Sequence, residues 1–282
     1  MKKFILAMTL LPALLFAEGV DSTSGWKHTL NGLANLSQSY FDNWTKGGSD
    51  ALNWEIRFEA SAVKDRPDFT WESKGKAAYG QSKIANLDPR KSSDELILET
   101  IYTRKLNDWI NPFASGRFQS QFAPGNKYDD APGSLAPVTR VSGSFDPSYA
   151  TQTLGAGYNW RKELQLRLGG TLKETFSSTR FGYADKKSTA KIETFKLEPG
   201  ASFTANYQKG LMENILLNST LDVFANFKGM DEVDTRWENT ITAKVNKYVN
   251  VNFGFDMLYD KDLSNSRQIK ENLAVGISFL SI

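Results

Sequence analysis

Residues 52–62 read Leu-Asn-Trp-Glu-Ile-Arg-Phe-Glu-Ala-Ser-Ala, and this stretch decides the fold class. Every second residue is apolar, and the residues between them are polar or charged. A strand sends successive side chains to opposite faces, whereas a helix would mix the two sets on one face. The stretch therefore predicts a strand with a polar face and an apolar face. The apolar face consists of Leu52, Trp54, Ile56, Phe58, Ala60 and Ala62.

The same period of two recurs along the chain, for example in 195–207 and 249–259. It predicts twelve strands, each at least 11 residues long. Soluble strands usually have about five or six residues, but a tilted strand needs ~9–11 to cross a bilayer. Strand length therefore favours a membrane barrel over a soluble β-sandwich. The predicted strands are 26–40, 50–63, 69–80, 94–105, 112–122, 149–160, 164–176, 193–208, 214–227, 234–245, 249–260 and 269–280.

The connections between these strands alternate in length. The first, third and later odd connections include the long segments 123–148 and 177–192, whereas the even ones include 64–68 and 161–163. Only 228–233 breaks the alternation. Bacterial outer-membrane barrels have an even strand count, short periplasmic turns and longer outer loops. We therefore expect an all-β fold, a single antiparallel transmembrane β-barrel of about 12 strands with both termini in the periplasm.

The N-terminus predicts export. Lys2 and Lys3 precede an almost wholly apolar run, 4–15, and Ala17 is a plausible cleavage point. This pattern is typical of a secretory signal peptide and is too short for a membrane span. We expect residues 1–17 to be the signal peptide and 18–282 to be the barrel domain, located in the outer membrane of a Gram-negative bacterium.

Composition excludes several classes of protein. The chain has no cysteine, which excludes disulfide scaffolds and thiolate zinc sites. Without Lys2 and Lys3, the 34 basic residues fall to 32, which equals the 32 acidic ones. This balance argues against nucleic acid as a partner. We expect no metal and no cofactor. The expected partners are outer-membrane lipid and small polar solutes.

Two residues fit the barrel poorly. Pro199 lies in the middle of a predicted strand, where a closed sheet has no free edge, so a bulge is expected there. Asn239 falls on the lipid-facing side of its strand.

The polar faces of the strands carry nine acidic and ten basic residues. Opposite charges on neighbouring strands can pair, and such pairs fill a lumen with structural ion pairs. The alternative is a polar pathway for a small solute. The main candidates for lining the lumen are Glu55, Arg57, Glu59, Lys74, Glu99, Arg117, Arg167, Glu198, Asp222, Arg236, Glu238 and Asp256. The same set contains Glu72, Lys76, Glu95, Lys173, Lys196, Lys244 and Lys270.

The sequence gives little support for an enzyme, and no catalytic residue is predicted. The one histidine, His28, lies two residues after Trp26 on the apolar face of the first strand. That position places it at the periplasmic interface, whereas outer-membrane hydrolases act from the outer side. The best interpretation is therefore a small-solute channel or transport barrel. The alternatives are a structural or surface-interaction barrel with a plugged lumen and, less favoured, an outer-membrane hydrolase.

Three segments resemble a known family. They are Asn35-Leu-Ser-Gln-Ser-Tyr-Phe-Asp-Asn-Trp-Thr-Lys-Gly-Gly48, Gln121-Phe-Ala-Pro-Gly125 with Tyr128 and Asp129, and Trp237-Glu238 followed by Lys244-Val-Asn-Lys-Tyr248. They are similar to a bacterial outer-membrane family catalogued as domain of unknown function 3078 (DUF3078). The resemblance implies an outer-membrane barrel. It implies no particular activity and no site residues.

Overall fold

The structure, a computed structural model, describes residues 25–39, 50–85, 87–128, 137–160, 163–185, 189–260 and 266–281. The predicted signal peptide lies outside these ranges. Among the described residues, no helix is both long enough and apolar enough to cross a bilayer.

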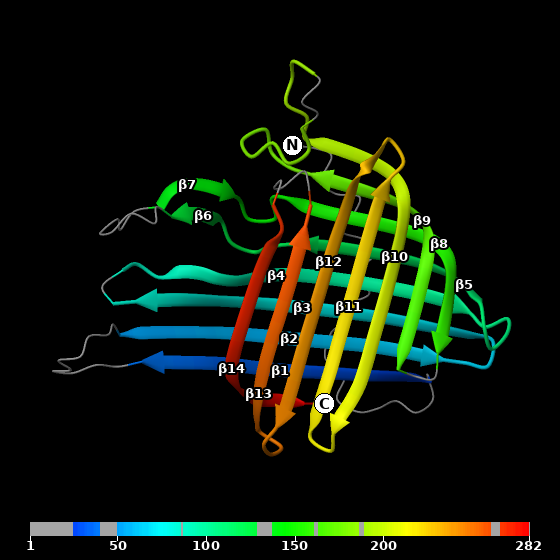
Figure 1. Ribbon diagram of the computed structural model, residues 1–282, viewed down its shortest axis with the longest axis horizontal. Helices are drawn as coiled ribbons and strands as arrows, with labels where there is room; N and C mark the ends of the chain where they lie inside the picture. Colours follow the sequence, from blue (N-terminus) through cyan, green and yellow to red (C-terminus); the bar gives the residue numbers. More distant parts are fainter. Residues whose placement is uncertain are drawn as a thin grey trace.

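Twelve strands of the described chain form one closed antiparallel barrel, and two short strands form a separate hairpin (Figure 1). The predicted fold is therefore confirmed. The hairpin is β6 (Gly125–Tyr128) with β7 (Pro137–Ser142). The barrel strands are β1 (Trp26–Ser39), β2 (Ala51–Asp65), β3 (Phe69–Ile84), β4 (Arg90–Arg104), β5 (Asn111–Ser120), β8 (Ser148–Trp160), β9 (Leu164–Phe176), β10 (Phe195–Met212), β11 (Ile215–Asn226), β12 (Gly229–Lys244), β13 (Val249–Tyr259) and β14 (Gln268–Ser281).

The barrel closes where β1 pairs with β14, so the main sheet has no open edge. Each remaining barrel strand pairs with its neighbour in the chain, except that β5 pairs with β8 across the hairpin. We call the end where β4 begins and β9 ends the long-loop end, and the opposite end the short-turn end. The strand ends that flank the long connections predicted from the sequence all lie at the long-loop end. The prediction was wrong for 81–93, because β3 and β4 extend into this segment and leave only 85–89 between them.

In Figure 1 strands β1–β4 of one wall cross β10–β14 of the other at a steep angle, as tilted strands of a closed barrel do, and β8–β10 bend between the two walls. Part of the bend lies where Gly155 of β8 faces Gly169 of β9. A Cβ atom on Gly155 would lie 2.1 Å from the Leu168 carbonyl oxygen and 2.5 Å from Gly169 Cα. Only glycine permits two backbones to approach so closely, and glycine is commonly found at barrel corners.

The outward face has the features of a surface in contact with a bilayer. Large apolar side chains point outward from mid-strand positions, and Leu154 is 71% exposed. Rings gather near the short-turn end, where the Trp26 and Trp71 centroids are 5.8 Å apart. Others gather at the long-loop end, where Phe176 and Phe195 are 5.2 Å apart. Aromatic girdles at both edges of an apolar band are typical of transmembrane barrels.

The expected bulge at Pro199 is absent. The β9–β10 register runs through Pro199↔Leu172 without a shift, and β10 begins to pair with β11 at Gly200↔Asn226. The Pro199 carbonyl accepts a hydrogen bond from Phe227 N at 3.0 Å, just beyond the end of that ladder. Because Pro199 lies at this boundary, its missing N–H removes no hydrogen bond from the β10–β11 ladder.

Asn239 faces outward as expected, and its amide has hydrogen-bond partners. Its Oδ1 accepts a hydrogen bond from Ser219 Oγ at 2.7 Å, and its Nδ2 donates to the Phe255 carbonyl at 3.4 Å. Trp237 Nε1 donates to the same serine hydroxyl at 3.0 Å. The polar group is therefore compatible with an apolar environment, because its neighbours replace water.

The segment 123–148, predicted as a plain loop, contains the β6–β7 hairpin. The hairpin lies at the long-loop end in Figure 1 and, in the described structure, pairs with no barrel strand. Asp94 holds its start, because this carboxylate accepts hydrogen bonds from Phe122 N and Ala123 N at 2.7 and 2.8 Å. Farther along, Tyr183 Oη donates to Val141 O at 2.8 Å, and burial raises the pKa of this phenol. The segment is thus fastened to the rim.

We expect cysteines introduced at the two ends of the barrel to react differently in whole cells. Asn126 and Asp65 are both exposed, one at the long-loop end and the other at the short-turn end. If the long-loop end faces outward, Asn126→Cys should react with an impermeant thiol reagent, whereas Asp65→Cys should react only after the cells are permeabilised. Labelling of Asp65→Cys alone in intact cells would show that the opposite end faces outward.

Candidate solute pathway in the barrel lumen

The register places all twelve candidate lumen residues on inward positions. Arg236 of β12 contacts Glu95 of β4, which lies half-way round the closed barrel, so both side chains must point inward. Every second residue along each of these strands therefore also points inward, and so do the residues paired with them in the neighbouring strands. The inward set from the register includes Glu55, Arg57, Glu59, Lys74, Glu99, Arg117, Arg167, Glu198, Asp222, Arg236, Glu238 and Asp256.

The contact between Arg236 and Glu95 is the centre of a bridge across the lumen, which we call the cross-lumen bridge. Arg236 Nη2 lies 2.5 Å from Glu95 Oε1 and 2.7 Å from Glu238 Oε1. Lys76 Nζ lies 2.7 Å from Glu95 Oε2. Each carboxylate is thus paired with a cation, and the two walls of the bent barrel are joined by side chains alone.

Two further ion pairs join strands that are not neighbours. Arg117 Nη1 of β5 lies 3.3 Å from Asp222 Oδ2 of β11, and Thr204 Oγ1 donates to Asp222 Oδ1 at 2.8 Å. Lys173 Nζ of β9 lies 2.6 Å from Asp234 Oδ2 of β12. Charged side chains therefore cross the lumen in three places in the described structure.

The other candidates pair along one wall or have looser surroundings. Arg57 pairs with Glu55 at 2.9 Å and lies 3.9 Å from Glu59. The Arg167 guanidinium lies 6.0 Å from the centre of the Phe113 ring. Lys74 pairs with Glu72 at 2.9 Å. Glu99 lies opposite Lys74 and Arg117 in the register, but has no ion pair in the described structure.

Glu198 is the most buried of the candidates. Its side chain is only 6% exposed, and Lys196 Nζ lies 3.0 Å from its Oε1. Asn226 Nδ2 donates to the same oxygen at 2.9 Å. This compact arrangement lies near the long-loop end of β10 and supports the wall.

Among the described residues, two acidic residues close to Lys173 were not predicted candidates. Asp234 and Asp260 both lie near Lys173 Nζ, at 2.6 and 3.9 Å. The alternation of β12 contains a signal for Asp234, because it shares a face with Arg236 and Glu238. Asp260 follows the last residue of β13, where alternation alone does not fix a side chain.

A cavity of about 340 Å³ lies above the cross-lumen bridge, and we call it the vestibule. It lies toward the long-loop end, between the β4–β5 wall and the β12–β14 wall. Its lining includes Glu95, Gln119, Arg236, Asp256 and Lys270. The vestibule is therefore polar, and the cross-lumen bridge forms part of its lining.

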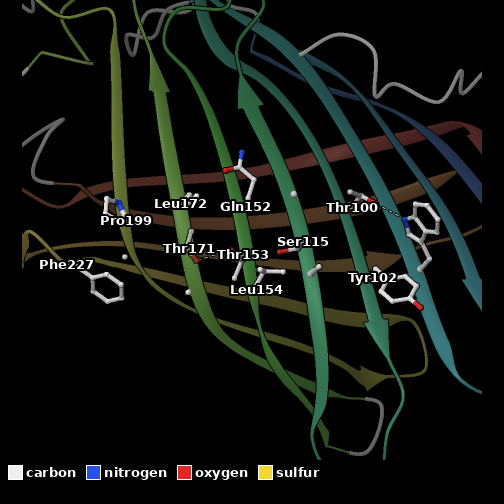
Figure 2. Close-up of a pocket in the computed structure, with 15 residues that line it drawn as sticks. Thr100, Tyr102, Ser115, Gln152, Thr153, Leu154, Thr171, Leu172, Pro199 and Phe227 are labelled. Carbon is white, nitrogen blue, oxygen red and sulfur yellow. Dashed lines mark hydrogen bonds between the residues drawn. The ribbon is translucent and has the colours of Figure 1, made fainter. Parts of the chain in front are cut away.

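A larger hollow, of about 640 Å³, lies over strands β3 to β10 (Figure 2). Its rim includes the outward side chains of Leu154, Leu172 and Phe227, which are 71%, 46% and 62% exposed. Trp71 Nε1 donates to Thr100 Oγ1 at 2.9 Å near its other edge. Because this lining is mainly apolar and faces outward, the hollow belongs to the membrane-facing surface and not to the lumen.

His28 has surroundings unlike those of a catalytic base. It is exposed on β1, and its ring centre lies 6.3 Å from that of Trp26 in a stacked arrangement. A general base must be within hydrogen-bond reach of the proton it takes. His28 instead forms part of the aromatic group at the short-turn end.

These features define the class of the protein as a transmembrane β-barrel of the outer-membrane type. Within this class, residues 36–126 match the profile of a family described as protein of unknown function (DUF3078). The family resemblance seen in the sequence is therefore confirmed over that part of the chain. No curated protein matches.

Three solved structures of barrels are similar to the chain. The translocator domain of the autotransporter NalP from Neisseria meningitidis has a TM-score of 0.40 and 12% identity, covering 94% of this chain and 90% of that one. An outer membrane channel from Pseudomonas putida F1 has a TM-score of 0.39 and 12% identity, covering 95% and 97%. The NanC porin has a TM-score of 0.41 and 8% identity, covering 89% and 99%.

Proposed function

We propose that the protein is an outer-membrane channel for small polar solutes, and that ion pairs across its lumen hold it closed. The observation that carries this proposal is the position of the cross-lumen bridge below the vestibule. A solute that enters from the long-loop end reaches Arg236 and Glu95 before it can go farther. The contact between opposite walls is made by two side chains, which can move without unfolding a strand.

The energetics are compatible with a reversible barrier. The side chains of Arg236 and Glu95 are 22% and 19% exposed, so both are still partly hydrated. Exposed ion pairs contribute about 0–1 kcal/mol, and loss of one partner of a buried pair costs ~3–5 kcal/mol. A partly hydrated pair lies between these limits. Rotamer changes could therefore open the pair on a timescale that is relevant to transport.

The rival function is a structural barrel with a permanently filled lumen. The specific observation in its favour is that Arg117–Asp222 and Lys173–Asp234 also join non-neighbouring strands. If all three contacts must break together, their free energies add and the lumen stays closed. The two functions therefore differ in whether removal of the cross-lumen bridge is sufficient to open the barrel.

Planar-bilayer recordings of the double variant Glu95→Gln/Arg236→Gln test the proposal. The change removes one negative and one positive charge, so the net charge of the lumen stays the same. We expect a several-fold increase in mean conductance over the unmodified protein, with a reversal potential near zero in a salt gradient. Little selectivity is expected because opposite fields cancel over a Debye length of ~8–10 Å.

The matched control is Glu72→Gln/Lys74→Gln, which removes a pair on β3 alone. It should leave conductance unchanged, because this pair does not join opposite walls. If the folded bridge variant conducts no better than the control, the permanently filled barrel is the correct function. Strong anion selectivity would contradict the assignment of the inward charges.

A further inference from the structure

The vestibule contains a carboxylate and an ammonium group that lie outside the cross-lumen bridge. Asp256 of β13 and Lys270 of β14 are opposite each other in the register and both line the cavity. In the described structure neither side chain has an ion pair or a side-chain hydrogen bond. Their neighbours differ in this respect, because Arg236, Glu95 and Lys76 are all paired with one another or with Glu238.

Two side-chain amides in the vestibule also have no polar partner in the described structure. Gln119 on the β5 wall and Gln268 on β14 also line the vestibule, and neither side-chain amide has a hydrogen-bond partner in the described structure. Amide side chains donate and accept equally. The cavity thus offers one cation and one anion that are held in no ion pair, and two uncharged polar groups, each oriented by a strand of the barrel.

The balance of charge restricts the ligand. In the wall of the vestibule, Glu95 and Glu238 are neutralised by Arg236 and Lys76, and Asp94 is neutralised by Lys91. Asp256 and Lys270 then cancel each other. An anion near Lys270 also meets Asp256, and a cation near Asp256 also meets Lys270, so a singly charged solute gains little net attraction. A solute that carries both charges can satisfy both groups at once.

We infer that the vestibule binds small zwitterionic solutes, that is, molecules with an ammonium and a carboxylate group, such as amino acids and short peptides. Asp256 accepts hydrogen bonds from the ammonium group, and Lys270 donates to the carboxylate. The amides of Gln119 and Gln268 contact the polar atoms between them. A cavity of about 340 Å³ is suited to a ligand of this size. The transport of such solutes rests on the proposed channel function, but their binding does not.

Saturation-transfer difference NMR on the full chain in detergent tests the inference, with glycylglycine as the probe. The method detects weak binding and does not depend on conduction. We expect saturable binding of glycylglycine, and at least tenfold weaker binding of acetate and of methylammonium. Asp256→Asn and Lys270→Gln should each weaken glycylglycine binding at least tenfold. Glu59→Gln and Lys74→Gln, which remove inward charges outside the vestibule, should leave it unchanged.

A charge exchange separates ligand contact from a change in shape. In Asp256→Lys/Lys270→Asp the two charges change places, and a zwitterion can bind in the reversed direction. We expect this variant to recover most of the affinity that either single change removes. Absence of glycylglycine binding, equal binding of acetate, or unaltered binding by Asp256→Asn would each overturn the inference. Binding without conduction in the bridge variant would refute only the channel, and conduction without glycylglycine binding would refute only the zwitterion site.

Discussion

Phe58→Arg is expected to destabilise the barrel by ~2–4 kcal/mol, the cost of a basic side chain near the middle of the bilayer. Phe58 lies midway along β2, is 42% exposed on the outward face, and has Gly32 and Ala77 as its register neighbours. Neither neighbour has a polar side chain that could pair with a guanidinium group. The measurement is unfolding of the protein by urea in lipid vesicles. The folded fraction is read on gels from the band whose mobility is characteristic of the folded barrel.

The adjacent residue supplies the control for this prediction. Glu59 points inward, its side chain is 45% exposed, and Arg57 is 3.9 Å away. Glu59→Gln should therefore change the free energy of unfolding by less than about 1 kcal/mol. A barrel that tolerates Phe58→Arg better than Glu59→Gln would mean that the register is wrong by one residue, because such a shift exchanges the two faces.

Gly155→Ala is expected to destabilise the barrel by forcing two strand backbones apart. The new Cβ would lie 2.1 Å from a backbone oxygen and 2.5 Å from Gly169 Cα, so the backbone of β8 or β9 must move. Overpacking typically costs about 1–3 kcal/mol. Because rigid backbone atoms are in the way, we expect a value at the upper end. Slower assembly into vesicles should accompany the loss of stability.

Gly170→Ala is the matched control, since it makes the same change on the neighbouring strand. A Cβ on Gly170 meets nothing within 4 Å. Alanine also restricts the unfolded chain, which stabilises compatible sites by ~0.4–1 kcal/mol. We expect an unfolding free energy equal to or slightly above that of the unmodified protein. If Gly155→Ala behaves like Gly170→Ala, the close approach of β8 and β9 does not shape the barrel.

Local features predicted much of this structure. The alternation in 52–62 fixed which side of β2 faces the lumen, and the same rule placed Arg236 and Glu238 together on β12. The alternation held at Pro199, but the bulge expected there is absent, because a single strand does not reveal where the ladder of its neighbour ends. It also could not reveal the β6–β7 hairpin, whose strands are short and whose stabilising contacts come from the rim, through groups such as Asp94.

The alternation of long and short connections was predicted only in part, since β3 and β4 extend into the predicted loop 81–93. By itself the sequence determined the number of barrel strands and their inward and outward faces. These properties depend on a period of two and on strand length, which are local. The tertiary structure alone decided which charges form ion pairs across the lumen and which do not. Arg236 and Glu95 are 141 residues apart and come into contact because the barrel closes and bends. Asp256 and Lys270 follow the same alternation, yet remain unpaired, because pairing depends on the distance and direction between side chains and not on the face that they share.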